Sequence, residues 1–297
     1  MNKKENINSI AKFNSYVGQE TLHPLISVID FSKLKPFKFR KGQMGVYSIF
    51  LKEVKCGDII YGCNHYDYEE GSLLFVAPDQ VYGMESDEPK QGKGHAILFH
   101  PDLLLGTSLG RHIHDYSFFS YDVNEALHLS ERERAVINDC FNKIQFELEH
   151  SIDKHSNTLI VSNLELLLNY SMRFYDRQFI TRHHVNTDIL VRFENALNQY
   201  FQSEQPLEKG LPSVAYCAGQ LHLSANYLGD LIKRETGKSA QEQIQNKVID
   251  IAKGKIFDGS KNIAEVAYEL GFKYPQHFTR MFKRITGHTP NEYKMLN

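Results

Sequence analysis

The sequence predicts an α+β protein of two domains, in which an antiparallel β domain and its following helices precede an all-helical C-terminal domain. Three observations predict this order. Short apolar runs separated by turn residues fill the N-terminal third, apolar residues recur at three- and four-residue spacing from Ser130 onward, and one stretch near the C-terminus occurs twice. The length of 297 residues also fits about two domains.

The strands are expected between about residues 20 and 105, in runs that are rich in β-branched and aromatic residues. These runs are MGVYSIFLKEV, DIIYG, SLLFVAP and HAILFHP, and glycines, Asp79 and the cluster QGKG punctuate them. Turn signals at intervals of ~10 residues indicate an antiparallel barrel or a sandwich.

Two amphipathic helices are expected between about residues 130 and 175. Ser130 followed by Glu133 is a capping box that begins the first helix. The second helix, from Leu159 through Met172, carries apolar residues on more than one face, which predicts burial against its own domain and against a second copy of the chain. We therefore assign residues 1–178 to a domain that also dimerises the protein.

An internal repeat lies in the remaining segment, residues 187–297. The stretch SVAYCAGQLHLSANYLGDLIKRETGKSAQEQ, from Ser213, matches NIAEVAYELGFKYPQHFTRMFKRITGHTPNEY, from Asn262, at offsets of 49 and 50 residues in its two halves. Each copy combines a short helix, a turn and a second helix with one apolar face. This combination is typical of a helix-turn-helix.

The two motifs are expected at 213–237 and 262–287, joined by a linker helix over 240–257. In the first motif, Ser224 is expected to cap the second helix. In the second motif, Gly271 can take the positive φ that ends a helix. DNA-binding versions of such motifs place their second helix in the major groove.

Three stretches make the C-terminal third resemble the DNA-binding domain of the AraC/XylS family of bacterial transcription regulators. They are AYELGF (267–272), the pattern HF..MFKR..G.TP..Y (277–293) and LSANYLGDLIKRETGKS (223–239). The resemblance implies a dimeric, sequence-specific regulator with an operator in double-stranded DNA as its partner, and RNA polymerase as an open further contact. It also implies a cupin-like sensing barrel at about 20–105 that binds a small-molecule effector, followed by dimerisation helices at about 130–175.

By the same resemblance, the N-terminal part of each second helix would face the DNA. The implied base contacts are Ser224, Ala225, Asn226, Asp230, Tyr274, Pro275, Gln276, Thr279 and Arg280. The implied phosphate contacts are Lys233, Arg234, Lys273, Lys283 and Arg284, for which a solvated helix face is the alternative. Because the carboxylate of Asp230 only accepts hydrogen bonds and repels phosphate, we expect the second motif to bind more strongly than the first.

Aromatic and polar residues of the expected strands are candidates for lining an effector cavity. They are Tyr47, Tyr61, Phe75, Tyr82 and His95. An interpretation that is equally open is that these side chains fill the interior of the β domain.

No motif indicates an enzyme or a resident cofactor. His65 has no second histidine two positions on, and His112 and His114 follow the strands without a carboxylate pattern, so no metal site is predicted. Two alternatives stay open: a metal-binding cupin fused to a DNA-targeting domain, and a ligand-independent regulator whose β domain serves dimerisation or protein contacts.

The net charge of −2 does not by itself indicate a nucleic-acid partner. Residues 187–297 carry 14 Lys+Arg against 12 Asp+Glu, and residues 259–297 carry six against three, so the basic excess belongs to the second motif. The chain has no run of ~20 apolar residues and no apolar leader core, and its four cysteines show no CxxC pairing. We therefore expect a cytoplasmic protein, with no membrane partner, whose thiols are reduced.

Overall fold

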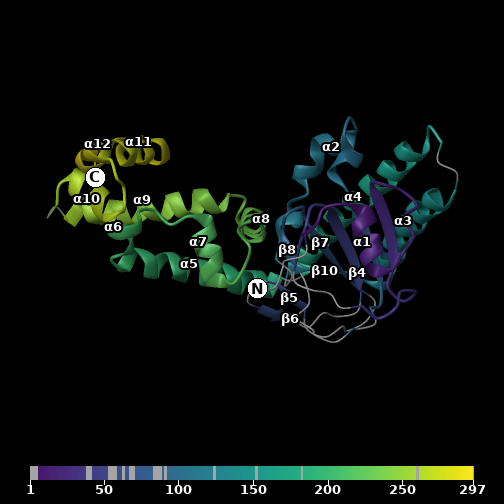
Figure 1. The fold of residues 1–297 in the computed structure, drawn as a ribbon. Helices are drawn as coiled ribbons and strands as arrows, with labels where there is room; N and C mark the ends of the chain where they lie inside the picture. The colour runs from purple at the N-terminus through teal and green to yellow at the C-terminus, as the bar shows by residue number, and fades with distance from the viewer. Residues whose placement is uncertain are drawn as a thin grey trace. The chain divides into compact units, whose positions relative to one another are not determined.

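The computed structural model describes residues 6–37, 42–52, 59–61, 64–66, 71–82, 89, 92–122, 125–150, 153–181, 183–258 and 261–296 (Figure 1). The chain divides into two compact units, Met1–Thr181 and Arg182–Asn297. Within the described residues, none of the helices combines the length and the apolar character that crossing a membrane requires.

A five-stranded antiparallel sheet forms the centre of the first unit. Its strands, in spatial order, are β10 (Leu127–His128), β7 (Ser72–Val76), β4 (Tyr47–Lys52), β9 (His95–Phe99) and β2 (Ile26–Asp30). A second sheet joins β1 (Asn6–Ile7), β3 (Gly42–Met44) and β8 (Val81–Tyr82), and a third pairs β5 (Ile59–Tyr61) with β6 (Asn64–Tyr66).

The prediction of an antiparallel N-terminal β unit is confirmed, but the described strands do not close into one barrel. Closure of the five-stranded sheet would require its two edge strands, β2 and β10, to pair with each other. Instead, β10 pairs on one side with β7, and the backbone groups on its other side bond to a helix. The described strands therefore remain three separate sheets.

Both faces of the five-stranded sheet are buried, which explains why its strands show little alternation of polar and apolar residues. All five residues of β7, SLLFV, are buried. On one face, Phe50 and Leu98 join a core with Ile10 and Phe13 of helix α1 (Ile10–Val17). On the other face, the ring of Phe75 lies 4.3 Å, centroid to centroid, from that of Phe118.

Two long helices, α3 (Glu131–Glu149) and α4 (Ser156–Thr181), pack against each other in this unit. The predicted capping box is confirmed, because the backbone N–H of Ser130 donates to the Glu133 carboxylate over 2.8 Å and the Ser130 hydroxyl accepts from the Glu133 N–H. Four short elements connect β9 to β10: η1 (Pro101–Leu104), α2 (Ser108–His112), η2 (Ile113–Asp115) and η3 (Ser117–Ser120).

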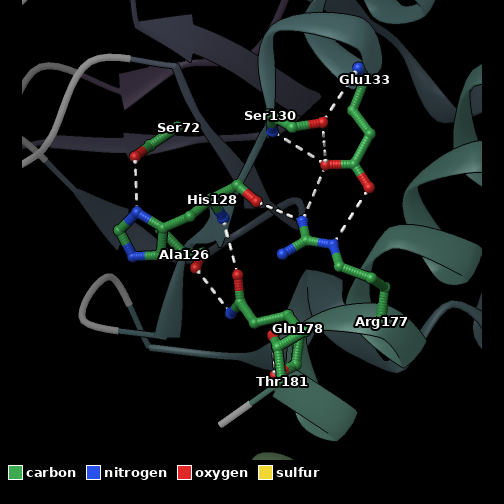
Figure 2. Close-up of polar contacts among 8 residues, drawn as sticks. All are labelled: Ser72, Ala126, His128, Ser130, Glu133, Arg177, Gln178 and Thr181. Atoms are coloured by element: carbon green, nitrogen blue, oxygen red, sulfur yellow. Dashed lines mark hydrogen bonds and ion pairs between the residues drawn. The ribbon is translucent and has the colours of Figure 1, made fainter.

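The last turns of α4 hold the edge strand β10 and the beginning of α3 (Figure 2). The Gln178 side chain accepts a hydrogen bond from the His128 N–H at 2.8 Å and donates to the Ala126 carbonyl at 3.2 Å. Arg177 donates to both carboxylate oxygens of Glu133, at 3.0 and 2.8 Å, and to the His128 carbonyl at 2.6 Å. These polar contacts continue α4 beyond the range that the apolar pattern predicted.

The second unit is all-helical, as predicted. Its helices are α5 (His183–Gln202), α6 (Gln205–Lys209), α7 (Val214–Leu221), α8 (Ala225–Thr236), α9 (Ala240–Asp258), α10 (Ile263–Glu269), α11 (Pro275–Thr286) and α12 (Pro290–Leu296). Helices α7 and α8 form the first helix-turn-helix, and α10 and α11 form the second. Helix α9 joins the two motifs and buries Val248, Ala252 and Ile256 completely.

Candidate nucleic-acid interface

The first recognition helix, α8, begins at the expected cap. The Ser224 hydroxyl accepts a hydrogen bond from the Tyr227 N–H at 3.1 Å, and the side chain is almost fully buried. Leu228 and Leu231 fix the inner face of the helix, because neither has any exposed surface. The hydroxyl of Ser224 is therefore engaged in holding the helix start, where it also stabilises the turn.

The outer face of α8 carries the other predicted contacts of the first motif. Asn226, Lys233 and Arg234 are exposed, whereas Ala225 and Asp230 are half-buried. The structure therefore brings an amide to the first turn of the helix and two cations to its last turn. This order suits base contact at the start of the helix and phosphate contact near its end.

The second recognition helix, α11, has the stronger division between its two faces. Phe278 and Phe282 are fully buried, while Gln276, Arg280 and Lys283 are exposed. The helix has no side-chain cap, because Tyr274 occupies the N-cap position and Pro275 follows. Its first backbone N–H groups therefore keep the partial positive charge that attracts phosphate.

Side chains around the start of α11 form a small aromatic and cationic group. Tyr274 is 53% exposed, and its ring lies 5.5 Å from the ring of His277 and 5.8 Å from the Lys273 ammonium nitrogen. Pro275 and Thr279 are half-buried beside them. His277 is a residue that the sequence-based contact set omitted, although it lies exposed one turn before Arg280.

One predicted phosphate contact already has a protein partner. Arg284 donates to the side-chain oxygen of Gln245, on α9, at 2.5 Å. Nearby, hydrogen bonds from the Ser239 hydroxyl and backbone N–H hold the pKa of Glu242 below its ordinary value, and Arg284 contributes to the same shift. Arg284 is therefore held against the linker helix.

Three of the five predicted effector residues have described side chains, and these pack against other residues of the first unit. The Tyr47 ring lies 5.0 Å from both Phe99 and Phe119, and its burial raises the pKa of the phenol. His95 lies with its Nε2 3.9 Å from the Asp30 carboxylate and its ring 6.2 Å from that of Phe141.

Tyr47, Phe75 and His95 thus share the helix-covered face of the sheet. The side chains of Tyr61 and Tyr82 lie outside the described residues. In the described part of the chain, no three His, Cys, Asp or Glu side chains gather as metal ligands would.

A family model described as a helix-turn-helix domain matches residues 217–295. Among curated proteins, a probable transcriptional regulator of Photobacterium leiognathi, LumQ, is 26% identical over 146 residues, which is 49% of this chain and 54% of that protein. An uncharacterised HTH-type transcriptional regulator of Bacillus subtilis, YtdP, is 30% identical over 98 residues, or 33% of this chain and 12% of its own. The chain thus spans about half or less of the length of these curated relatives.

Among solved structures, ToxT from Vibrio cholerae matches 91% of this chain and 97% of its own, at 16% identity and a TM-score of 0.31. A transcriptional regulator from Chromobacterium violaceum, described as containing an AraC-type DNA-binding domain, matches 36% of this chain at 20% identity and a TM-score of 0.31. The helix-turn-helix match, the regulator relatives and the repeated motif together show that the C-terminal part of the chain is an AraC-type helix-turn-helix domain.

Proposed function

We propose that the protein is a sequence-specific transcription regulator that binds double-stranded operator DNA through α8 and α11. The observation that carries this proposal is the repetition of one design within a single compact unit. Each motif buries the apolar face of its second helix and exposes a polar face that begins with an amide, at Asn226 in α8 and Gln276 in α11. Amides at the start of such a helix suit adenine, and in α11 Arg280, one turn after Gln276, suits guanine.

The contact roles follow from position on each helix. We assign base contact to Ser224, Ala225, Asn226, Asp230, Tyr274, Pro275, Gln276, Thr279 and Arg280. We assign phosphate contact to Lys233, Arg234, Lys273, Lys283 and Arg284. Within these sets, Ser224 acts mainly through its cap, and Arg284 must exchange its bond to Gln245 for a phosphate.

The test begins with selection of bound sequences from random double-stranded DNA by the full chain, followed by gel-shift titration of the best sequence. Arg280→Ala should weaken binding by about 10- to 100-fold and relax the preference at one base pair, since a bidentate arginine–guanine pair is worth about 1–3 kcal/mol. Asp230→Ala should change affinity less. The reverse order would contradict dominance of the second motif, and a wild-type chain that enriches no sequence would contradict the function itself.

We propose further that the first unit is a cupin-like sensing domain that dimerises through α3 and α4 and binds a small-molecule effector. Support for dimerisation comes from Leu159 and Leu166, which lie seven residues apart on α4 and are 45% and 40% exposed. An effector can alter DNA affinity only by favouring one arrangement of the protein over another. A thermal-shift screen of metabolites against the full chain tests the effector, and its hits should also change operator affinity.

A ligand-independent regulator is the second candidate, and one observation favours it. Tyr47 and Phe75 pack with Phe99, Phe118 and Phe119 in one aromatic cluster, so two of the candidate effector residues are already in contact with other rings of their own unit. In this case no metabolite should shift the thermal transition at saturating concentration. Added metabolites should then leave operator affinity unchanged, and operator occupancy should depend on protein concentration alone.

A further inference from the structure

The turn between α10 and α11 makes a backbone contact that leaves no room for a side chain. Gly271 has a φ of +91°, and a Cβ added there would lie 2.7 Å from the Gly210 carbonyl carbon and 2.8 Å from the carbonyl oxygens of Gly210 and Pro206. Such separations are far below van der Waals contact between unbonded heavy atoms. The turn of the second motif is therefore seated directly on the end of α6.

Gly210 is held in place from its other side. Its φ of 81° and ψ of −150° belong to a region that is essentially restricted to glycine. Its N–H donates to the Pro206 carbonyl at 3.0 Å, and its own carbonyl accepts the Tyr200 hydroxyl at 2.9 Å. Tyr200 is only 2% exposed, so packing around its ring holds the hydroxyl in position for this bond.

The same segment is tied to the first motif. The ring of Tyr200 lies 5.0 Å from that of Tyr216 on α7, and the Tyr216 hydroxyl donates to the Gln205 side chain at 2.9 Å. Near the beginning of α5, the Asn186 amide donates to the Glu235 carboxylate of α8 at 2.9 Å. Helix α5 thus packs on both helices of the first helix-turn-helix.

The end of this segment belongs to the core of the second motif. Phe201, in the last turn of α5, and Leu211, just after α6, pack against the cluster that contains Phe272, Phe278 and Phe282. In Figure 1, α5 and α9 both extend between the first motif and the second. Residues 183–212 therefore touch both motifs, independently of the linker helix.

We propose that α5 and α6 form a second strut that fixes the separation and orientation of the two recognition helices, and that the contact between Gly210 and Gly271 is its joint. The inference rests on the proposed DNA-binding function and adds two positioning residues to it. With α5–α6 and α9 both joining the motifs, the unit accepts operators with one separation between two half-sites, where a half-site is the DNA segment that one recognition helix of the chain contacts. Inserting one base pair moves a half-site by about 3.4 Å and rotates it by roughly 34°, so a rigid unit loses the contacts of one recognition helix.

The chain offers a matched pair of variants. Gly271→Ala and Gly287→Ala both place a Cβ at positive φ, +91° and +85°, but nothing lies within 4 Å of the position that a Cβ would take at Gly287. Both variants therefore carry the same cost of placing an alanine at positive φ. Only Gly271→Ala also forces Gly271 away from Gly210.

The experiment titrates the full-length protein with its selected operator and with versions that carry one base pair more or less between the half-sites. The wild type and Gly287→Ala should lose about tenfold or more in affinity on either change, because one helix loses its base contacts. Gly271→Ala should bind the selected operator more weakly and should discriminate the three spacings by about threefold or less. A spacing profile of Gly271→Ala that matches that of Gly287→Ala would overturn the strut.

A measurement without DNA separates failure of the strut from failure of the function. Spin labels on non-canonical amino acids at the exposed positions Ala215, on α7, and Asn291, on α12, report the distance between the motifs. The distance distribution should broaden or shift in Gly271→Ala and stay as in the wild type in Gly287→Ala. If the wild type binds no specific sequence, the proposed function fails. The distances still show whether α5 and α6 fix the separation of the two motifs.

Tyr200→Phe covers the case in which Gly271→Ala does not fold. This variant keeps the buried ring and removes only the hydroxyl, which bonds to the Gly210 carbonyl at 2.9 Å and also contacts the Gln205 carbonyl of α6 at 3.4 Å. It should change spacing discrimination and the distance distribution in the same direction as Gly271→Ala, by a smaller amount. A wild-type profile in both measurements would overturn the role of this bond and, with it, the joint.

Discussion

Lysines of the helical unit differ in whether they are available to phosphate. Lys255 donates to Glu269 at 2.8 Å, and Lys261 contacts the other carboxylate oxygen of the same residue. Lys273, by contrast, lies exposed beside the ring of Tyr274 at the start of the second recognition helix. Sequence counts treat the three as equal, but Lys255 and Lys261 are paired with Glu269, whereas Lys273 lies on the proposed interface.

Lys273→Ala should weaken binding to all DNA sequences about equally. Each phosphate contact contributes about −0.9 to the slope of log affinity against log salt, so the slope should decrease in magnitude by about 1. DNA titrations of the wild type and of Lys273→Ala at several salt concentrations measure this slope. Lys261→Ala is the control, because Glu269 already neutralises that lysine, and equal slopes for the two variants would contradict the assignment of Lys273.

Glu269 also predicts a pH dependence of stability. Hydrogen bonds from Lys255, and then from Lys261, hold its pKa below the ordinary 4.5. A carboxyl with a lowered folded pKa stabilises the protein fully above its unfolded pKa, and this contribution is lost as pH falls through the folded value. Because both ion pairs are partly exposed, each is worth about 0.2–1 kcal/mol.

Glu269→Gln should therefore lower the free energy of unfolding at neutral pH by about 1 kcal/mol. The difference from the wild type should shrink toward zero as pH falls below 4.5. Urea unfolding of the full chain across this range measures the effect. Glu194→Gln, an exposed change on α5, should leave stability within about 0.5 kcal/mol at all pH values.

At the scale of elements, the end of α4 acts as a substitute strand for β10. The Gln178 amide satisfies one N–H and one carbonyl on the free side of the strand, as a neighbouring strand would, and the side chain is only 2% exposed (Figure 2). Removing it leaves two buried backbone groups without this partner. A lost buried hydrogen-bond partner costs about 1–3 kcal/mol.

Gln178→Ala should lower stability by that amount, about 1–3 kcal/mol, and should speed amide hydrogen exchange at His128 more than elsewhere in the sheet. Mass-resolved hydrogen exchange on the full chain measures both. Gln145→Ala is the matched control, since that amide bonds to Glu149 on the exposed surface of α3. Unchanged exchange at His128 in Gln178→Ala would contradict the role of the side chain.

The elements that the sequence predicted well are those whose own pattern determines them. The capping box at Ser130 and the repeat from Ser213 needed only local residues, and both appear in the structure. Helix α6 was missed because Pro206 and Gly210 indicate a breaker, whereas its contacts to Tyr200 and Gly271 are tertiary. The end of α4 was missed for the same reason, since polar bonds to a distant strand stabilise it.

The candidate functional residues also differ in whether a local sequence pattern predicts their orientation. A recognition helix is amphipathic, so its buried residues, such as Phe278 and Phe282, identify the outward ones. The strands of the central sheet are buried on both faces, so alternation does not reveal which face Tyr47 or Phe75 occupies. For that reason the sequence could predict which residues of α8 and α11 face outward, but not which face of the sheet the candidate effector residues occupy.

At the scale of the whole molecule, the small net charge limits what a single chain achieves on DNA. The helical unit, residues 182–297, has only three more basic than acidic residues, and several of its cations are paired. Non-specific attraction to phosphate is therefore modest. In the proposed dimer, specific occupancy comes from base contacts together with the joining of two chains, because joining raises the effective concentration of the second pair of motifs.

The exposed apolar residues of α4 make this dependence testable. Leu159, Leu166 and Ile180 are 45%, 40% and 74% exposed, and their spacing in multiples of seven places them along one side of the helix. The double change of Leu159→Glu and Leu166→Glu should convert a dimer into a monomer in sedimentation velocity, because like charges would then face each other across the interface. Met295→Glu, on the 86% exposed residue of α12, is the matched control and should remain dimeric.

The double variant with Leu159→Glu and Leu166→Glu also separates the contribution of dimerisation from that of the recognition helices. Its affinity for DNA that carries the site of one chain only should equal that of the wild type, because α8 and α11 are untouched. Its affinity for the full operator should fall by about 10²- to 10⁴-fold, the range that linking two binding modules supplies. A variant that stays dimeric, or a monomer that keeps full-operator affinity, would contradict dimerisation through α4, since avidity requires both copies to engage at once.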